Sequence, residues 1–211
     1  MVRPRSVVAH EKVLRAALEL FSRRGVEGTS MDSIAQASGV SKATIYNHWA
    51  DKEALLMEVM IFVNGLDREP EDVDTGDICR DLAWVLSRRH PDEFDDARNR
   101  ITPSLIAYSA LHREFGDAWR NRVMEPARNC LRRILCRGIE RKLLPATLDM
   151  EASLALMLGP ILYAHIFQQG NPPPVVDLGR KTAEAFWRAF SVERRSALNA
   201  QGLAPQKRHR S

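Results

Sequence analysis

The side chains best suited to chemistry lie between residues 39 and 56, in the stretch GVSKATIYNHWADKEALL. Asn47 carries a donor and an acceptor side by side, the pair of groups that can read an adenine edge in the DNA major groove. Thr44 offers a hydroxyl and a methyl group, and the small Ala43 would let a helix approach a duplex closely. These residue types predict contacts with base edges.

Other polar residues of the same stretch suit the sugar–phosphate backbone of DNA. Tyr46, His48 and Lys52 can donate hydrogen bonds to phosphate oxygens, which set the register of a protein on DNA without reading its sequence. Lys42 adds a further positive charge to this stretch, which also suits phosphate. A helix needed only for core packing would not require so many hydrogen-bonding side chains.

Two short helices joined by a tight turn would position these side chains. The apolar spacing predicts helices over residues 10–24, 31–38 and 43–49. Gly39 breaks the chain before the third of these helices, and Ser41 can cap it. This is the spacing of a helix-turn-helix, whose second short helix enters the major groove.

The two faces of the third helix differ in character. Ile45 and Trp49, four residues apart, are expected to face inward, although Tyr46 and Trp49 could also both be core residues. Thr29 or Ser30 is expected to cap the second helix. The side chains expected to point outward are Lys42, Ala43, Thr44, Tyr46, Asn47 and His48.

The whole run ALELFSRRGVEGTSMDSIAQASGVSKATIYNHWADKEALL resembles the DNA-binding domain of the TetR family of transcriptional regulators. The resemblance covers about residues 9–66. Trp49 stands where the family usually has Phe, so an aromatic residue is kept there. The residues that carry the resemblance are Phe21, Gly25, Thr29, Ile34, Ala35, Gly39, Val40, Ser41, Thr44, Tyr46, His48, Lys52, Glu53 and Leu55.

This resemblance implies a DNA-binding role for particular residues. It makes the six outward side chains of the third helix the recognition contacts, with Lys52 holding a phosphate at the start of a fourth helix. We also assign Thr29, before the second helix, to the DNA contacts. Residues 1–8, with Arg3 and Arg5, are expected to be either a flexible arm that adds DNA contacts or a solvated terminus.

The rest of the chain also reads as helical, so the expected fold class is all-α. No alternating Val, Ile and Thr segment argues for a strand. About nine helices are expected in total, in three parts: a helix-turn-helix domain over 9–66, an effector-binding and dimerisation domain over 67–192, and a basic, disordered tail over 193–211. The helices expected beyond the third span about 52–66, 77–89, 97–112, 117–142, 150–168 and 175–191, with Pro126 kinking or splitting the one over 117–142.

The expected helix over 150–168 is apolar almost all round and needs cover on several sides. A second subunit would supply that cover, and the resemblance implies a homodimer through the last two helices; a buried core helix of a monomer is the alternative. Bulky residues that combine size with a polar or adaptable group are candidates for an effector pocket. They are Trp84, Tyr108, Trp119, Met124, Met157 and Tyr163.

Charge and composition limit the class of protein. The net charge is +4, but the acid-free segment 194–211 alone carries five basic residues, whereas residues 1–50 hold seven basic residues against four acidic ones. The basic start is therefore better evidence for DNA binding than the net charge is. The start has no signal-peptide pattern, and no apolar run is long enough to span a membrane, so a cytoplasmic protein is expected.

The sequence also bears on catalysis and cofactors. Three cysteines, Cys79, Cys130 and Cys136, fit reduced thiols, and the histidines at 90, 112 and 165 lack metal-ligand spacing, so we expect neither a metal nor a cofactor. A helical enzyme would need a catalytic set or a phosphate-binding loop, and we find none. The expected function is a ligand-responsive DNA-binding regulator, most often a repressor. The alternatives are an activator of the same family and a constitutive architectural DNA-binding protein.

Overall fold

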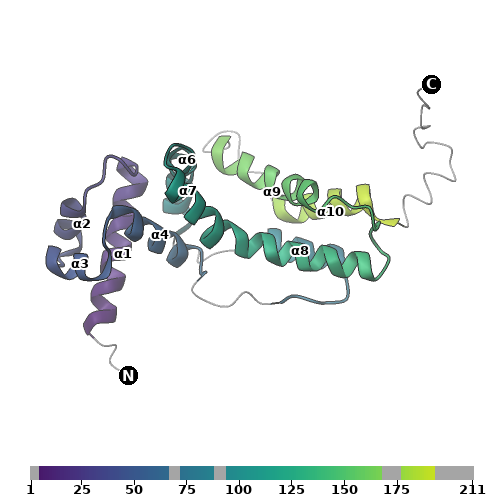
Figure 1. Ribbon diagram of the computed structural model, residues 1–211, viewed down its shortest axis with the longest axis horizontal. Coiled ribbons are helices and arrows are strands. Elements are labelled where there is room, and N and C mark those ends of the chain that lie inside the picture. Colours follow the sequence, from purple (N-terminus) through teal and green to yellow (C-terminus); the bar gives the residue numbers. More distant parts are fainter. Residues whose placement is uncertain (1–4, 67–71, 88–93, 168–176, 193–211) are drawn as a thin grey trace. The chain divides into compact units, whose positions relative to one another are not determined.

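The computed structural model describes residues 5–66, 72–87, 94–167 and 177–192, and every regular element in these ranges is a helix (Figure 1). The chain forms two compact units. We call the first, residues 1–70, 89–127 and 165–172, the head, and the second, residues 71–88, 128–164 and 173–211, the body. The expected tail over 193–211 lies outside the described residues.

The first four helices of the head begin and end where the local sequence predicts. They are α1 (Arg5–Arg24), α2 (Met31–Ser38), α3 (Lys42–His48) and α4 (Lys52–Val63). The helix α1 starts earlier than the expected residue 10, so the last residues of the expected arm form its first turns. Gly25 and Gly39 follow α1 and α2 with φ of 72° and 67°, the left-handed conformation that glycine adopts without strain.

Side chains cap the N-termini of three of these helices. Ser30 accepts a hydrogen bond from the Ser33 N–H at the start of α2, and Ser33 returns one to the Ser30 N–H. Ser41 caps α3 as expected, and Asp51 accepts from the Ala54 N–H at the start of α4. Each such cap stabilises a helix by about 0.5–2 kcal/mol, which matters for helices this short.

The core of the head takes in two helices from later in the chain. Leu18 and Phe21 of α1 share one apolar cluster with Ile101 and Leu105 of α6 (Asp95–Leu111) and with Phe115 of α7 (Arg113–Trp119). The compact head is therefore formed by α6 and α7 as well as by the helices within residues 9–66. Pro103 lies inside α6, which continues past it.

A continuous helical run follows residue 112. The helix α7 passes directly into a π-helical turn, η2 (Arg120–Met124), and then into α8 (Glu125–Glu140). Pro126 has no N–H to donate, so an uninterrupted α-helix could not pair the carbonyl of residue 122. The π turn directly before it is the local response. Counting this run once, the described residues form nine helical runs, the number expected.

The body is built from α5 (Ile78–Leu86), α10 (Leu178–Phe190) and most of α8 and α9 (Met150–Phe167). The helices α5 and α10 pack closely. Asp149 accepts from the Ala152 N–H at the start of α9, as expected. Within the described residues, no helix has both the length and the apolar character needed to cross a membrane. The side chains that fill the body core include Ile78, Leu82, Leu131, Ile134, Leu135, Leu154, Met157 and Phe186.

Ion pairs hold the segment before α5 against α8. Asp72 pairs with Arg137 at 3.0 Å, and Asp74 pairs with Arg141 at 2.8 Å. Arg137 also donates to the Val73 carbonyl. Hydrogen bonds from Arg137 and Arg141 lower the pKa values of Asp72 and Asp74, respectively. These pairs are at the surface, so they direct the chain more than they stabilise the fold.

The contact between α5 and α10 generates a stability prediction at Gly179. A methyl group there would lie 2.6 Å from the Ser87 nitrogen and still closer to the Leu86 carbonyl, so the backbones would have to separate. We expect Gly179→Ala to lower the free energy of unfolding by about 1–3 kcal/mol, measured by urea denaturation. The control is Gly159→Ala in α9, where a methyl group meets no atom within 4 Å. An equal loss in both variants would contradict the packing described.

Candidate nucleic-acid interface

The helix α3 is held by a cap at one end and by buried side chains along one face. Ser41 accepts a hydrogen bond from the Thr44 N–H at 3.2 Å, and the two hydroxyls lie 2.8 Å apart. At the other end the N–H of Trp49, the C-cap, donates to the Ile45 carbonyl. Ile45 and Trp49 are 1% and 2% exposed, so the inward face is the one expected.

The opposite face of α3 is open to solvent. Tyr46 is 50% exposed, which shows that it is not a core residue, whereas Thr44 is half-buried because its hydroxyl lies against the Ser41 cap. Figure 1 shows α3 at an edge of the head, beside α2. The remaining residues expected to point outward are all exposed: Lys42, Ala43, Asn47 and His48.

Besides Thr44, three more of the expected DNA contacts have partners within the protein. The Lys42 ammonium forms an exposed ion pair with Asp32 at 2.6 Å. The Lys52 ammonium donates to the Val26 carbonyl at 2.8 Å and so ties the start of α4 to the loop after α1. Thr29 is 2% exposed, and its hydroxyl donates to the Gly25 carbonyl at 2.8 Å. The Thr29 side chain is therefore held by the fold.

A polar junction behind α3 could not be anticipated from the helix-turn-helix pattern. Glu58 of α4 accepts a hydrogen bond from the Trp49 indole nitrogen, and its other oxygen lies 2.7 Å from His10 Nε2 of α1. The His10 ring lies 4.7 Å from the Trp49 ring and 5.6 Å from the His48 ring, centroid to centroid. The tryptophan in place of the usual phenylalanine was the signal that could have led to this junction, because only tryptophan offers an N–H.

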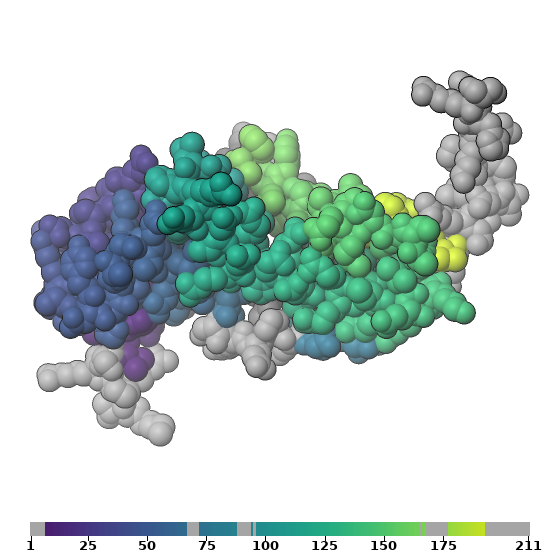
Figure 2. Space-filling view, in the orientation of Figure 1, coloured from purple at the N-terminus to yellow at the C-terminus, as the bar shows by residue number. Residues whose placement is uncertain are grey.

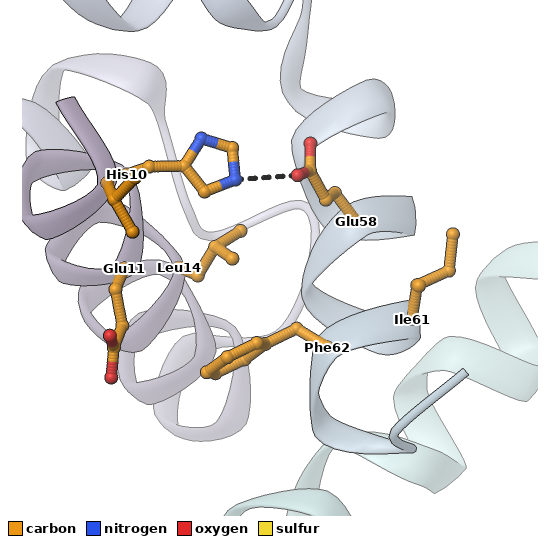
Figure 3. A pocket seen from close by; sticks show the side chains of 7 residues that line it. His10, Glu11, Leu14, Glu58, Ile61 and Phe62 are labelled. Carbon is orange, nitrogen blue, oxygen red and sulfur yellow. Dashed lines mark hydrogen bonds and ion pairs between the residues drawn. The ribbon is translucent and has the colours of Figure 1, made fainter. Parts of the chain in front are cut away.

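The junction borders a cavity of about 280 Å³ between α1 and α4. Figure 3 shows the His10 ring reaching across to Glu58, with Leu14 and Phe62 beside them. Glu11 also lines the cavity, but its carboxylate accepts two hydrogen bonds from Arg15. The cavity is therefore mostly apolar, with one polar wall formed by His10 and Glu58.

A second polar contact ties the start of α4 to α6. The Tyr108 hydroxyl donates to Glu53 Oε1 at 2.6 Å, and the His112 ring stacks on the Tyr108 ring at 3.8 Å. Burial and, after it, the hydrogen bond to Glu53 raise the pKa of Tyr108 to about 12. Tyr108 is therefore a fixed core contact of the head.

The six candidate effector residues divide between the two units. Tyr108, Trp119 and Met124 belong to the head, and Trp84, Met157 and Tyr163 belong to the body. Met157 is fully buried in the body core, whereas Tyr163 is 57% exposed. None of the six lines the cavity between α1 and α4 or a groove of about 360 Å³ between α9 and α10.

The chemistry available for catalysis or metal binding is slight in the part of the chain that the structure describes. No group of three or more His, Cys, Asp or Glu side chains there could hold a metal ion. Cys79, Cys130 and Cys136, which all lie within the described ranges, form no disulfide. What the arrangement offers is a short helix with an exposed polar face.

Comparison with protein families identifies both parts of the chain. Residues 13–59 match the family described as bacterial regulatory proteins, tetR family. Residues 72–184 match the family described as tetracyclin repressor-like, C-terminal domain. Together the two matches span most of the described helices.

Several curated proteins are similar to this chain over most of their length. The HTH-type transcriptional regulator YdeS of Bacillus subtilis is 33% identical over 76% of this chain and 80% of its own. The HTH-type transcriptional regulator AcrR of Shigella flexneri is 30% identical over 71% of this chain and 73% of its own. The DNA-binding transcriptional repressor TetR of Mycobacteroides abscessus is 26% identical over 80% of this chain and 86% of its own.

Solved structures share the fold. A TetR transcriptional regulator from Agrobacterium tumefaciens matches with a TM-score of 0.64 and 19% identity, over 89% of this chain and 97% of that one. A protein from Mesorhizobium loti assigned to the TetR family matches with a TM-score of 0.62 and 22% identity, over 90% of this chain and 100% of that one. At these identities the likeness shows the fold alone.

The raised pKa of Tyr108 generates a prediction for alkaline conditions. The unfolded chain loses this proton near the ordinary value of 10.0, and the folded protein keeps it to about 12. Stability from Tyr108 is therefore fully present below pH 10 and is lost as the pH rises to about 12. We expect the free energy of unfolding to fall less steeply above pH 10 in Tyr108→Phe than in the wild type.

Urea denaturation at a series of pH values on either side of 10 would measure this difference. Tyr46→Phe, at an exposed tyrosine of the same unit, is the matched control. Parallel pH dependence in the wild type and Tyr108→Phe would contradict the burial and hydrogen bonding described for Tyr108.

Proposed function

This chain belongs to the tetR family of bacterial regulatory proteins and is a DNA-binding transcriptional regulator, and we propose that it acts as a dimeric repressor released from its operator by a small molecule. As a member of this family it is a regulator and not an enzyme. The observation that carries the proposal is the exposed polar face of α3, backed by buried Ile45 and Trp49. The proposed site of action is a near-palindromic operator in the cytoplasm.

The proposed base contacts come from Ala43 and Thr44 near the N-terminus of α3 and from Asn47 near its C-terminus. Asn47 is exposed and can present its amide to an adenine edge. The Thr44 methyl group and the small Ala43 would lie against the groove floor. Because Thr44 shares its hydroxyl with the Ser41 cap, its contribution would be apolar contact more than hydrogen bonding.

The proposed phosphate contacts are Lys42, Tyr46, His48 and Lys52. The Lys42 ammonium pairs with Asp32 in the DNA-free protein, and an exposed pair of this kind is easily exchanged for a phosphate. The Lys52 ammonium has three hydrogens and uses one on the Val26 carbonyl, so it can still donate to DNA. The buried, hydrogen-bonded hydroxyl of Thr29 gives no such support, and we leave Thr29 out of the contact set.

Dimer formation through α9 and α10 is supported by apolar surface on the body. Three large side chains of α9 are open to solvent: Leu156, Leu162 and Tyr163 are 55%, 38% and 57% exposed. Apart from Glu151, the helix carries no Asp, Glu, Lys or Arg to make this surface hydrophilic. Figure 2 shows light-green side chains of α9 at the surface. Leu156 and Pro160 border the groove with Phe186 and Phe190 of α10. A second copy of these helices would cover this surface.

Such a dimer would present two copies of α3 to one face of the DNA. Recognition helices roughly 34–36 Å apart fit successive major grooves, so the operator would be near-palindromic. We assign DNA binding to residues 9–66, and effector binding and dimerisation to 67–192. The two family matches, at 13–59 and 72–184, support this division.

Repression and release by a ligand are supported by the relatives. One similar protein is described as a DNA-binding transcriptional repressor, and the family matched by residues 72–184 is described as tetracyclin repressor-like. Release would follow if a small molecule bound more tightly to a conformation that fits the operator poorly. An activator of the same family would use the same contacts, and the operator position relative to the promoter distinguishes the two.

The DNA contacts generate a prediction for operator binding. We expect the double variant Tyr46→Ala, Asn47→Ala to bind the DNA upstream of its own gene at least ~10-fold more weakly than the wild type, because a base contact and a phosphate contact are both removed. Mobility shift across a salt series would measure this. Lys42→Ala should lower the slope of log affinity against log salt by about 1, because it removes one cation from the phosphate backbone.

The control for these variants is their unfolding free energy, which should change by less than about 0.5 kcal/mol because the positions are exposed. Equal, sequence-indifferent binding by the wild type and the double variant would contradict the proposal. It would favour a constitutive architectural protein that binds through its basic segments.

The apolar surface of α9 generates a prediction for the oligomeric state. We expect Leu156→Glu to sediment as a monomer in analytical ultracentrifugation, because the interface would bury an unpaired charge. Leu111→Glu is the matched control, since Leu111 is 81% exposed at the end of α6 in the head. A wild-type monomer, or dimers of both variants, would contradict dimerisation through this surface.

A further inference from the structure

We propose that Glu58 is a positioning residue for DNA reading: it holds the C-cap of α3 through the Trp49 indole and so fixes the end of the helix that carries Asn47 and His48. This inference rests on the proposed use of α3 as the recognition helix. It assigns a role to a carboxylate on α4 that bonds to Trp49 and His10. Three sets of contacts within the head support this inference.

The first step is the position of Trp49. It is the C-cap of α3, and its backbone N–H donates to the Ile45 carbonyl at 2.9 Å. Its side chain is 2% exposed. The indole ring and the last turn of α3 are therefore joined by a single residue, and a shift of the ring moves the end of the helix.

The second step is the acceptor that the indole requires. A buried N–H without a hydrogen-bond partner is costly, and Glu58 Oε2 is the partner of Trp49 Nε1. Glu58 lies on α4, where the neighbouring side chains Leu55, Leu56 and Val59 are fully buried in the core of the head. The acceptor is therefore fixed in place by a packed helix.

The third step is the tie to α1. Glu58 uses its other oxygen on His10 Nε2, 2.7 Å away, so one carboxylate joins α1, α4 and the end of α3. His10 also lies over the Trp49 ring, and the ring of His48, the last residue of α3, lies 5.5 Å from that of Trp49. The outer face of α3 thus ends at a histidine that touches this junction.

A surface carboxylate with no such role would be replaced at little cost. The Glu58 side chain is 39% exposed beside the cavity, so its pair with His10 is partly screened by solvent. The contact with the buried indole is the one that solvent cannot replace. The expected effect of removing Glu58 is therefore a loss of DNA affinity that depends on Trp49.

The experiment compares Glu58→Ala, Glu58→Gln and Trp49→Phe, and combines each Glu58 change with Trp49→Phe. Glu11→Ala is the matched control, because Glu11 lines the same cavity and bonds to Arg15, whereas the Trp49 indole bonds to Glu58. Operator affinity is measured by mobility shift, and folding by circular dichroism and thermal melting. The indole N–H resonance of Trp49, assigned by its absence in Trp49→Phe, reports the hydrogen bond.

We expect Glu58→Ala to weaken operator binding by about 10-fold and to shift the Trp49 indole resonance. Glu58→Gln keeps an oxygen for the indole. Its loss of operator affinity, on a logarithmic scale, should be less than about half of the loss in Glu58→Ala. In the Trp49→Phe background the two Glu58 changes should differ little, since phenylalanine has no N–H to satisfy. Glu11→Ala should match the wild type.

Several outcomes would overturn the proposal. Unchanged affinity in Glu58→Ala, equal losses in Glu58→Ala and Glu58→Gln, or the same loss with and without Trp49 would each do so. Should Glu58→Ala fail to fold, Glu58→Gln provides the test. Its loss of operator affinity in the wild-type background is compared with its loss in the Trp49→Phe background, and equal losses would overturn the proposal. A wild type that does not bind the operator would defeat the proposed function itself, and the indole resonance would still report the hydrogen bond.

Discussion

The proposed recognition helix, α3, has seven residues, and a helix this short is not stable by its own backbone hydrogen bonds. Its geometry has to be imposed by its surroundings. Ser41 fixes one end, Ile45 fixes the middle, and Trp49 fixes the other end by burial and by the bond to Glu58. The rest of the head supplies the packed surface that receives these three side chains. The outer face of α3 can carry polar groups because the cap and the two buried side chains already hold the helix.

The surfaces that receive α3 come from both near and distant parts of the sequence. The helices α1 and α4 supply His10 and Glu58, which meet at its C-terminal end. The helix α6 packs on α1, and Tyr108 on α6 holds Glu53 at the start of α4. The helices that support α3 are thus themselves held by contacts with α6. This arrangement explains why the head includes residues well beyond those of the helix-turn-helix.

Local patterns in the sequence predict much of this structure. The caps at Ser41 and Asp149, the breaks at Gly25 and Gly39, and the inward pair Ile45 and Trp49 each depend on residues within a few positions of one another. The predicted DNA-binding function depends in addition on the resemblance of residues 9–66 to a known family. The family matches confirm a DNA-binding transcriptional regulator, and the helices of the described residues confirm the all-α fold.

Long-range packing could not be predicted in the same way. Nothing in the local pattern shows that Tyr108 meets Glu53, or that Glu58 lies between Trp49 and His10, because these pairs join separate helices. For the same reason the candidate effector residues were chosen by type, and the structure divides them between two units. The hydrogen bond from Thr29 to the Gly25 carbonyl is local, but it depends on how the turn after α1 closes.

The central claim, that the outer face of α3 reads base edges, is tested most directly by the sequence preference of a single variant. Binding of wild type and Asn47→Ala would be measured against operators that carry each base pair in turn at every half-site position. We expect Asn47→Ala to lose its preference at one position in each half-site and to keep the wild-type preference elsewhere. Wild-type preference at every position in Asn47→Ala would contradict the claim that this residue, on the exposed face of α3, takes part in reading the sequence.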